Sequence, residues 1–197
     1  MFAQPSRRGR EEPLPQQPTD RLFFAIFPDT GAAARIARLS QALRAQHRVR
    51  GKSLATERLH VSLHHVGDYA GLPQHIVAAA CRVASALAVR PFTVEFNGAA
   101  SFRGRPGHQP FVLLGDDGIV GLQALQQGLG NALDAAGLGH ANLHYTPHVT
   151  LVYGDRLVAD RPVEPITWGV REFVLVHSLL GRSRYIPLER FRLNAQA

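Results

Sequence analysis

The sequence predicts an α+β fold made of two similar lobes, and two observations lead to this expectation. Strand and helix periodicities occur twice in the same order: an apolar strand, a helix and a strand that carries a histidine. In addition, 88 positions separate Phe23 from Phe111 in the two opening strands, and the same offset separates His60 from His148. Equal offsets of this kind indicate an internal duplication. Two such lobes facing each other would bring the two histidines to one cleft.

The first repeat opens with the compact apolar segment RLFFAIF, which is typical of a buried strand and is followed by Pro28 and Asp29. Behind it, Ile36, Leu39 and Leu43 recur at helical spacing, with arginines off that stripe. The elements expected in this half are a strand at 21–27, a helix from 30 to about 46, a strand containing His60, a helix from 74 to about 88 and an alternating strand at 90–102.

The second repeat begins with FVLLGDD, which resembles the opening strand in length and apolar character. Leucines at helical spacing then predict a helix, and the strand containing His148 follows. The elements expected in this half are a strand at 111–117, a helix from about 120 to 136, the histidine strand, and a closing hairpin formed by 166–179 and 183–193.

The domain organisation follows from composition. Residues 1–19 are rich in Pro, Gln and Arg without periodicity, which predicts a flexible tail. With 45% hydrophobic residues the rest can form a packed core, so we expect one domain over 20–197, with repeats that start near 22 and 110. The net charge is +7 and Lys52 is the single lysine, so arginine supplies the excess. Arginine matches phosphate geometry, which favours an anionic partner, although coding bias toward arginine explains the charge equally well.

The sequence also allows a prediction of the cellular location of the protein. No apolar stretch approaches the roughly 20 residues needed to span a bilayer, and the first residues lack the apolar segment of a secretory signal. Cys81 is the only cysteine, so no disulfide can form within the chain. We therefore expect a cytoplasmic protein without a membrane partner.

The tetrads HVSL and HVTL, which begin at His60 and His148, carry the chemistry. Residues i and i+2 of a strand lie on one face, so each tetrad sets an imidazole beside the hydroxyl of Ser62 or Thr150. Histidine changes charge near neutral pH and can take up or release a proton. A hydroxyl can donate a hydrogen bond to a phosphate oxygen. Two such pairs at duplicated positions fit a phosphodiester, whose cleavage needs a general base and a general acid.

These tetrads resemble the paired signatures of the two-histidine (2H) phosphoesterase superfamily, and most of all those of the RNA 2′,3′-cyclic phosphodiesterases, also called the 2′-5′ RNA ligase family. The resemblance extends over nearly all of 21–193. RLFFAIFP is similar to the family's opening strand, and ERLHVSLHHVGD and HYTPHVTL are similar to its two signatures. Trp168, the stretch FVLVHS and the segment 185–191 are similar to its closing part.

The resemblance implies a bilobal fold in which two antiparallel sheets form a central cleft, with helices packed outside. It implies that His60 and His148 are the catalytic pair and that Ser62 and Thr150 hold the phosphate. Ser62 stands where threonine is more usual, but the hydroxyl is retained. Tyr153 occupies a position where the family often has arginine, and residues 64 and 65 are histidines in place of a lysine and an aromatic residue.

The expected reaction is hydrolysis of a 2′,3′-cyclic phosphate, on RNA ends or nucleotides, to a 2′-phosphomonoester. One histidine would activate water, the other would protonate the departing 3′ oxygen, and the sequence does not say which is which. No metal or other cofactor is expected, the partner is RNA or a nucleotide with a 2′,3′-cyclic phosphate, and the chain needs no second copy, so we expect a monomer. The reverse reaction, 2′-5′ RNA ligation, is expected as a side activity.

Other residues give weaker expectations. The loop SFRGRPGHQP joins the repeats, and in it Arg103 could hold a phosphate and Phe102 could stack on a base, or the loop could be an ordinary basic one. Alternation places Tyr153 on the apolar face of its strand, where core packing is expected. The same rule places His64 on the face of His60, solvated or reaching the cleft. Tyr185 is expected to be structural, as is Trp168.

Three alternatives remain open at this point. A metal-dependent hydrolase could use His60, His64 and His148, although neither tetrad has Cys beside it and the nearest carboxylates are Glu57 and Asp68. A non-catalytic RNA-binding module could keep the same fold. A phosphodiesterase could act on another small cyclic nucleotide or on a 2′-5′ linked oligonucleotide.

Overall fold

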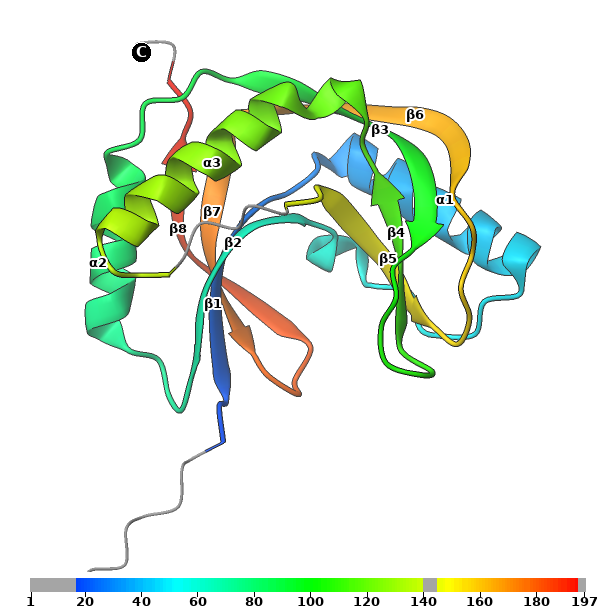
Figure 1. The fold of residues 1–197 in the computed structure, drawn as a ribbon, viewed down its shortest axis with the longest axis horizontal. Helices are drawn as coiled ribbons and strands as arrows, with labels where there is room; N and C mark the ends of the chain where they lie inside the picture. Colours follow the sequence, from blue (N-terminus) through cyan, green and yellow to red (C-terminus); the bar gives the residue numbers. More distant parts are fainter. Residues whose placement is uncertain (1–16, 140–144, 195–197) are drawn as a thin grey trace, which may run out of the picture.

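The computed structural model describes residues 17–139 and 145–194, and these form one eight-stranded antiparallel sheet with three α-helices and two short 3-10 helices (Figure 1). The α+β class is therefore confirmed. The strands are β1 (Asp20–Ile26), β2 (Val61–Tyr69), β3 (Phe92–Ser101), β4 (Gln109–Leu114), β5 (His148–Gly154), β6 (Arg161–Val170), β7 (Glu172–Leu179) and β8 (Arg184–Arg192). The α-helices are α1 (Thr30–His47), α2 (Gln74–Ser85) and α3 (Val120–Ala135), and the 3-10 helices are Thr56–Arg58 and Asp117–Ile119.

The sheet has the strand order β6-β3-β4-β5-β2-β1-β7-β8. Its two four-stranded halves are joined where β2 meets β5, and there a single residue pair, Val61 with Val149, connects them. Figure 1 shows the halves bent toward each other like the sides of an arch. The two sheets expected from the resemblance are thus halves of one continuous sheet, with the two histidine-bearing strands side by side at its centre.

The duplication is visible in the topology. In each repeat an opening strand pairs antiparallel with the strand of the histidine motif, β1 with β2 and β4 with β5. The helix between them packs away from its own strands in both repeats. Helix α1 contacts β5 and β6 of the other half, and α3 contacts β2 across the junction as well as β3. This exchange of helices ties the two halves into one hydrophobic core.

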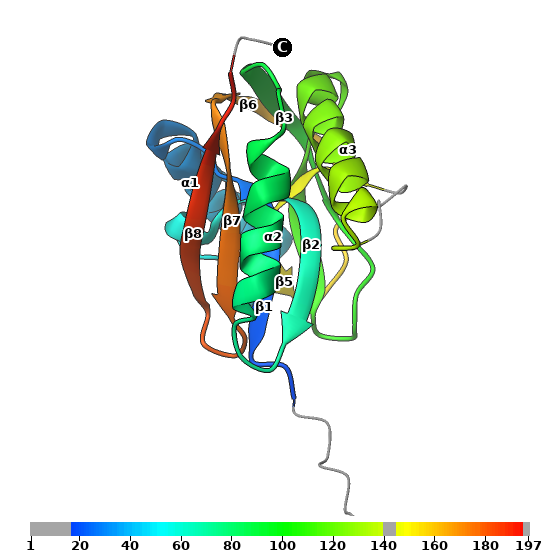
Figure 2. The same ribbon diagram turned by 90° about the vertical axis from the view of Figure 1, so that its left-hand side faces the viewer.

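The helices form where their sequences predict them. The carboxylate of Asp29 accepts a hydrogen bond from the backbone N–H of Ala32 at 2.8 Å and so caps the start of α1, whose apolar stripe buries Ile36 and Leu43. Figure 2 shows α2 beside α3 on the outside of the sheet, and α2 also contacts β8. None of the helices in the described ranges is long and apolar enough to cross a membrane.

The closing hairpin was only partly predicted. The expected strand 166–179 is two strands, separated at Arg171. β6 pairs with β3 at one edge of the sheet, whereas β7 pairs with β1 and forms the hairpin with β8 at the other edge. The continuous apolar pattern did not reveal this change of partner, because strand pairing depends on residues far away in the sequence.

The start of the domain is fixed by a buried polar cluster around Asp20. Residues 1–16 of the expected tail lie outside the described residues, but Thr19 already belongs to the domain, because its backbone is bonded to Tyr69 and to Leu180. The Asp20 carboxylate accepts hydrogen bonds from the Thr19 hydroxyl at 2.5 Å, from His177 Nε2 at 2.5 Å and from the backbone N–H of Gly71 at 3.1 Å. These donors, the Thr19 hydroxyl foremost, hold the pKa of Asp20 below its usual value of 3.8.

We expect Asp20→Asn to lower the free energy of unfolding at pH 7 by about 1–3 kcal/mol, because buried donors then face a weaker, uncharged acceptor. A carboxylate with a lowered pKa stabilises the fold above its unfolded pKa and loses that effect as the pH falls through its folded pKa. The difference between wild type and variant should therefore shrink below pH 3.8. Urea unfolding at pH 7 and at a pH below 3.8 measures the difference in the free energy of unfolding. The control is Asp160→Asn, which changes an exposed aspartate. Equal stability of Asp20→Asn and wild type at pH 7 would contradict the prediction.

Candidate active site

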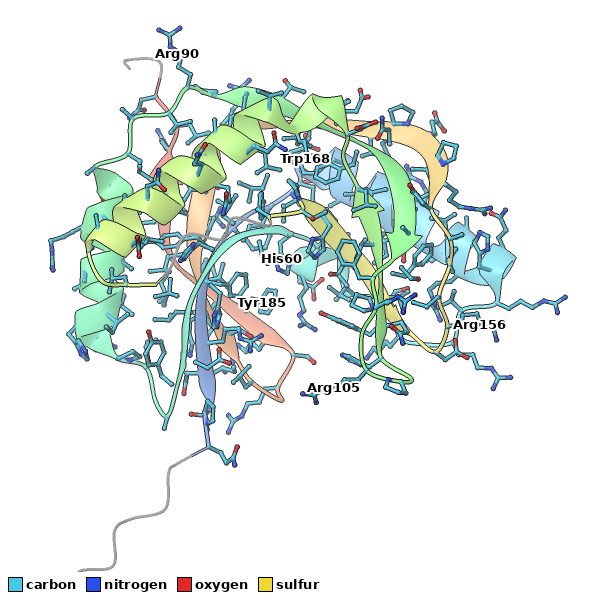
Figure 3. The ribbon with its side chains drawn as sticks, viewed as in Figure 1. His60, Arg90, Arg105, Arg156, Trp168 and Tyr185 are labelled. Carbon is cyan, nitrogen blue, oxygen red and sulfur yellow. The ribbon has the colours of Figure 1, made fainter. Side chains whose placement is uncertain are left out.

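A cleft of about 520 Å³ lies where the two halves of the sheet meet, and it is lined by His60, Ser62, His148 and Thr150. The structure thus brings together the two tetrads that the sequence singled out. Figure 3 shows His60 at the centre of the arch, between the halves. His148 is the first residue of β5, whereas β2 begins one residue after His60, so the first histidine stands just ahead of its strand.

The pairing of Val61 with Val149 sets the arrangement of these four side chains. Continuing its antiparallel register places His60 opposite Thr150 and Ser62 opposite His148. Each histidine therefore lies beside the hydroxyl of its own strand and faces the hydroxyl of the other. The two histidines occupy diagonal positions, which in an antiparallel pair are roughly 7–8 Å apart. A phosphate group fits between side chains at that spacing.

Each imidazole is held by a hydrogen bond to the backbone carbonyl two residues earlier in the chain. Nδ1 of His60 lies 2.7 Å from the carbonyl oxygen of Arg58, and Nδ1 of His148 lies 2.7 Å from that of Thr146. A carbonyl only accepts, so in each ring Nδ1 carries the proton and, in the neutral form, Nε2 keeps its lone pair. Nε2 of His60 lies 3.1 Å from the Ser62 hydroxyl, which can donate to it. The duplicated contact fixes the tautomer that a general base requires.

A matched pair of β-bulges decides which further residues face the cleft. In β2 the register skips Leu63 between Ser62 and His64, and in β5 it skips Leu151 between Thr150 and Val152. A bulge puts two residues opposite one and reverses the alternation beyond it. The bulged leucines are themselves 88 positions apart, so this feature belongs to the duplication.

The reversal corrects two predictions. His64 was expected on the face of His60, but it is buried on the opposite side with 5% exposure, and His65 lines the cleft instead. Tyr153 was expected in the core, but it is 40% exposed and lines the cleft at the position that corresponds to His65. The metal site proposed from His60, His64 and His148 fails for the same reason. In the part of the chain that the structure describes, no three His, Cys, Asp or Glu side chains are grouped to hold a metal ion.

Aromatic rings pack against both histidines. His60 lies edge-to-face against Tyr185, with ring centroids 5.4 Å apart, and contacts Phe23 at 5.3 Å. His148 lies edge-to-face against Phe102 at 4.9 Å. Tyr185 was expected to be structural, yet it forms part of the cleft wall (Figure 3). Trp168 does what was expected of it, because it is buried and stacks on Phe96.

The loop between the repeats gives a mixed result. Phe102 reaches the site through its contact with His148, whereas Arg103 is exposed and does not line the cleft. From the same loop, His108 stacks flat on Tyr153, with centroids 4.3 Å apart. The loop therefore contacts the site through the rings of Phe102 and His108. The phosphate contact expected from Arg103 stays a prediction.

The electrostatics of the cleft favour an anion. Burial, and to a lesser degree the charges of His148 and Arg58, lowers the pKa of His60 to about 4. Burial also lowers the pKa of His148. Asp68, which contacts two residues of the cleft wall, is already engaged, because Arg21 donates two hydrogen bonds to it at 2.7 and 2.6 Å and His65 lies 2.9 Å away. These contacts, that of Arg21 first, hold the pKa of Asp68 far below its usual value.

The arrangement therefore contains two proton-transfer groups, two hydroxyl donors and two arginines, Arg21 and Arg58, around a phosphate-sized space. Tyr145 also links the repeats, because its hydroxyl donates to the carbonyl oxygen of Ser62 at 2.9 Å. A phosphodiester held here would have one imidazole on each side of phosphorus. The sequence analysis missed the roles in the cleft of Arg21, Arg58, His65, Tyr153 and Tyr185. Two of these, His65 and Tyr153, face the cleft because of bulges that the sequence pattern does not reveal.

Comparison with known proteins agrees with this geometry. A family model described as the 2′-5′ RNA ligase superfamily matches residues 27–182. No curated protein matches the chain by sequence. Among solved structures, Escherichia coli LigT complexed with 3′-AMP is 28% identical, with a TM-score of 0.71 over 90% of this chain and 99% of that one. LigT complexed with NADP+ is 27% identical, with a TM-score of 0.69 over 91% and 99%. TT0787 of Thermus thermophilus, at 21% identity, shares the fold, with a TM-score of 0.70 over 90% and 100%.

The depressed pKa of His60 can be tested through His148. We expect His148→Gln to raise the pKa of His60 above about 4, because one positive charge is removed, while burial keeps it below 6.5. Ring ¹H–¹⁵N NMR titration of the free protein measures this pKa and the Nδ1-protonated tautomer together. His75→Gln, an exposed histidine on α2, should leave it unchanged. A pKa of His60 that does not move in His148→Gln would show that the two rings are not electrostatically coupled.

Proposed function

This chain belongs to the 2′-5′ RNA ligase superfamily of 2H phosphoesterases, and on that basis we propose that it hydrolyses 2′,3′-cyclic phosphates to 2′-phosphomonoesters without a metal ion. The substrate is an RNA end or a nucleotide. The observation that carries the proposal is the duplicated histidine geometry, in which each ring donates from Nδ1 to the carbonyl two residues earlier and turns Nε2 to a shared cleft. The nucleotide complexes of Escherichia coli LigT support a nucleotide ligand.

We assign the general base to His60. Its pKa of about 4 leaves it neutral at physiological pH, with Nε2 unprotonated and able to act as a base. Water held by Nε2 attacks phosphorus in line and passes its proton to His60. The bond from phosphorus to the 3′ oxygen breaks as the new bond forms, and this leaves the phosphate on the 2′ oxygen.

His148 is the general acid in this assignment. The departing 3′ oxygen takes a proton from Nε2 of His148, the second imidazole that lines the cleft. The anionic phosphate beside it favours the protonated ring, so substrate binding promotes the required state. After the reaction His60 holds a proton and His148 has lost one, and exchange with water restores both.

Ser62 and Thr150 are positioned to hold the non-bridging oxygens. Their hydroxyls face the cleft from the two halves of the sheet and need no reorganisation when charge builds on the phosphate. Ser62 also donates to Nε2 of His60 in the free protein at 3.1 Å. A bound phosphate takes over this donor and frees Nε2 to meet the attacking water. One chain supplies all of these groups, which agrees with a monomeric enzyme.

Replacing either histidine tests the function. We expect His60→Ala and His148→Ala each to reduce kcat by about 10²–10⁴-fold, because each removes one proton-transfer group. The assay uses a short RNA with a 2′,3′-cyclic phosphate in EDTA, with the product assigned by phosphorus NMR, and His75→Ala is the matched control. A loss of less than tenfold in both variants would refute the assignment. RNA binding without turnover by wild-type protein would instead indicate a binding module.

The hydroxyls give a separate test. We expect Ser62→Ala and Thr150→Val each to reduce kcat on the order of 10²-fold, the effect of removing one donor to developing oxyanion charge. Ser85→Ala, at the exposed end of α2, is the control. Because the proton-transfer groups remain, the pH dependence of kcat/KM should keep its shape. Unchanged kcat in both variants would show that these hydroxyls do not contact the phosphate in the transition state.

A further inference from the structure

A tyrosine outside the cleft joins the two histidine motifs. The hydroxyl of Tyr145 donates a hydrogen bond to the carbonyl oxygen of Ser62 at 2.9 Å. Tyr145 lies three residues before His148, so this bond runs from the segment that leads into the second motif to the backbone of the first. The two motif strands, β2 and β5, pair with each other at one position only, Val61 with Val149. The tyrosine hydroxyl therefore makes a second connection between the motifs beside that pair.

The two carbonyl groups that hold the imidazoles stand on different kinds of backbone. The Arg58 carbonyl, which accepts from Nδ1 of His60, belongs to the 3-10 helix that precedes β2. The backbone N–H of Arg58 donates to the carbonyl oxygen of Ala55 at 2.8 Å, so a helical turn fixes this acceptor. The Thr146 carbonyl, which accepts from Nδ1 of His148, lies ahead of β5 in a segment without regular secondary structure. No helical turn fixes this second acceptor.

Tyr145 is placed to anchor that second acceptor. It directly precedes Thr146, so a hydrogen bond from its side chain restrains the backbone that carries the Thr146 carbonyl. The residue 88 positions earlier is Glu57, an exposed residue of the 3-10 helix, so the tyrosine has no counterpart in the first repeat. Burial raises the pKa of the Tyr145 hydroxyl above its usual value of 10. The hydroxyl therefore remains a donor throughout the pH range in which histidine titrates.

We propose that Tyr145 is a positioning residue, which fixes the place of His148 relative to Ser62 from outside the cleft. The inference rests on the proposed function, because it concerns how two groups of that reaction are aligned. Through the Thr146 carbonyl the tyrosine holds the imidazole of His148, and through its own hydrogen bond it holds the backbone of Ser62. Tyr145 is not among the residues that line the cleft, so it acts through these two and not on the substrate.

Removing the hydroxyl tests the proposal. We expect Tyr145→Phe to reduce kcat for a short RNA with a 2′,3′-cyclic phosphate by about 10–100-fold, because small displacements of reacting groups are costly. KM should stay unchanged, because no group that contacts substrate is removed. The matched control is Tyr69→Phe, which also removes a hydroxyl that donates to a backbone carbonyl, that of Val66 at 3.4 Å. Tyr69 ends β2 and does not line the cleft, so the control should keep the wild-type kcat.

Ring ¹H–¹⁵N NMR of the free protein gives a readout that does not depend on turnover. In wild-type protein both rings carry their proton on Nδ1. We expect Tyr145→Phe to convert His148 to a mixture of the two neutral tautomers, because its acceptor carbonyl is no longer fixed. His60 should keep its Nδ1 proton, because the helical turn still holds its acceptor. A general loosening of the fold would affect both rings alike.

A double-mutant cycle with His148→Gln separates positioning from a general structural role. If Tyr145 acts through His148, Tyr145→Phe should cause little further loss of kcat in the His148→Gln protein, because the group that it positions is already gone. An equal loss of kcat with and without His148 would show that the hydroxyl only supports the fold, and this would overturn the proposal.

Tyr145→Met repeats these measurements and protects the test against a folding defect in one variant. It also lacks the hydroxyl, and its flexible apolar side chain adapts to the space of the ring. Thermal unfolding of each variant shows whether it is folded. A wild-type kcat, or an unchanged tautomer of His148, in a folded Tyr145 variant would overturn the proposal and leave the proposed function intact. If wild-type protein turns over no cyclic phosphate, the proposed function itself fails, and the ring tautomers still decide whether Tyr145 positions His148.

Discussion

The site depends on one backbone contact, the pairing of Val61 with Val149. These residues stand between the histidine and the hydroxyl residue of each tetrad, so their pairing brings the two tetrads together at the cleft. The same pair joins the two halves of the sheet, and each half contains strands from both repeats. One residue pair therefore both joins the halves of the sheet and aligns the two tetrads. The exchange of helices between the halves stabilises that junction from outside the sheet.

The paired bulges show how a strand can serve both a core and a site. Regular alternation would bury every second residue of β2 and β5 and point the others to the cleft. The bulged Leu63 and Leu151 break this rule, so each strand places an imidazole, a hydroxyl and then a further polar or aromatic residue on the cleft side. The family position that often carries arginine is Tyr153 here, and its ring stacks on His108. In this chain that wall of the cleft carries stacked rings where the family often has a charged side chain.

The sequence was sufficient to predict the features that depend on local periodicity and on the internal repeat. Periodicity located the helices, and the 88-residue offset of His60 and His148 revealed the duplication and predicted the shared cleft. It was insufficient where the outcome depends on distant partners. The separation of β6 from β7 follows from pairing with β3, and the burial of His64 follows from a bulge that local alternation does not encode. Tyr185 and Arg58 reach the site from separate elements, so no single motif contains them.

Burial of the two histidines places a constraint on acid–base chemistry in the cleft. It lowers the pKa of both imidazoles, and the charges of His148 and Arg58 lower that of His60 further. In the proposed mechanism His60 is the base and is neutral in the free protein, whereas His148, as the acid, must be protonated. A bound phosphate would favour that protonation, because its negative charge opposes the effect of burial. By linkage, substrate binding and proton uptake would then strengthen each other.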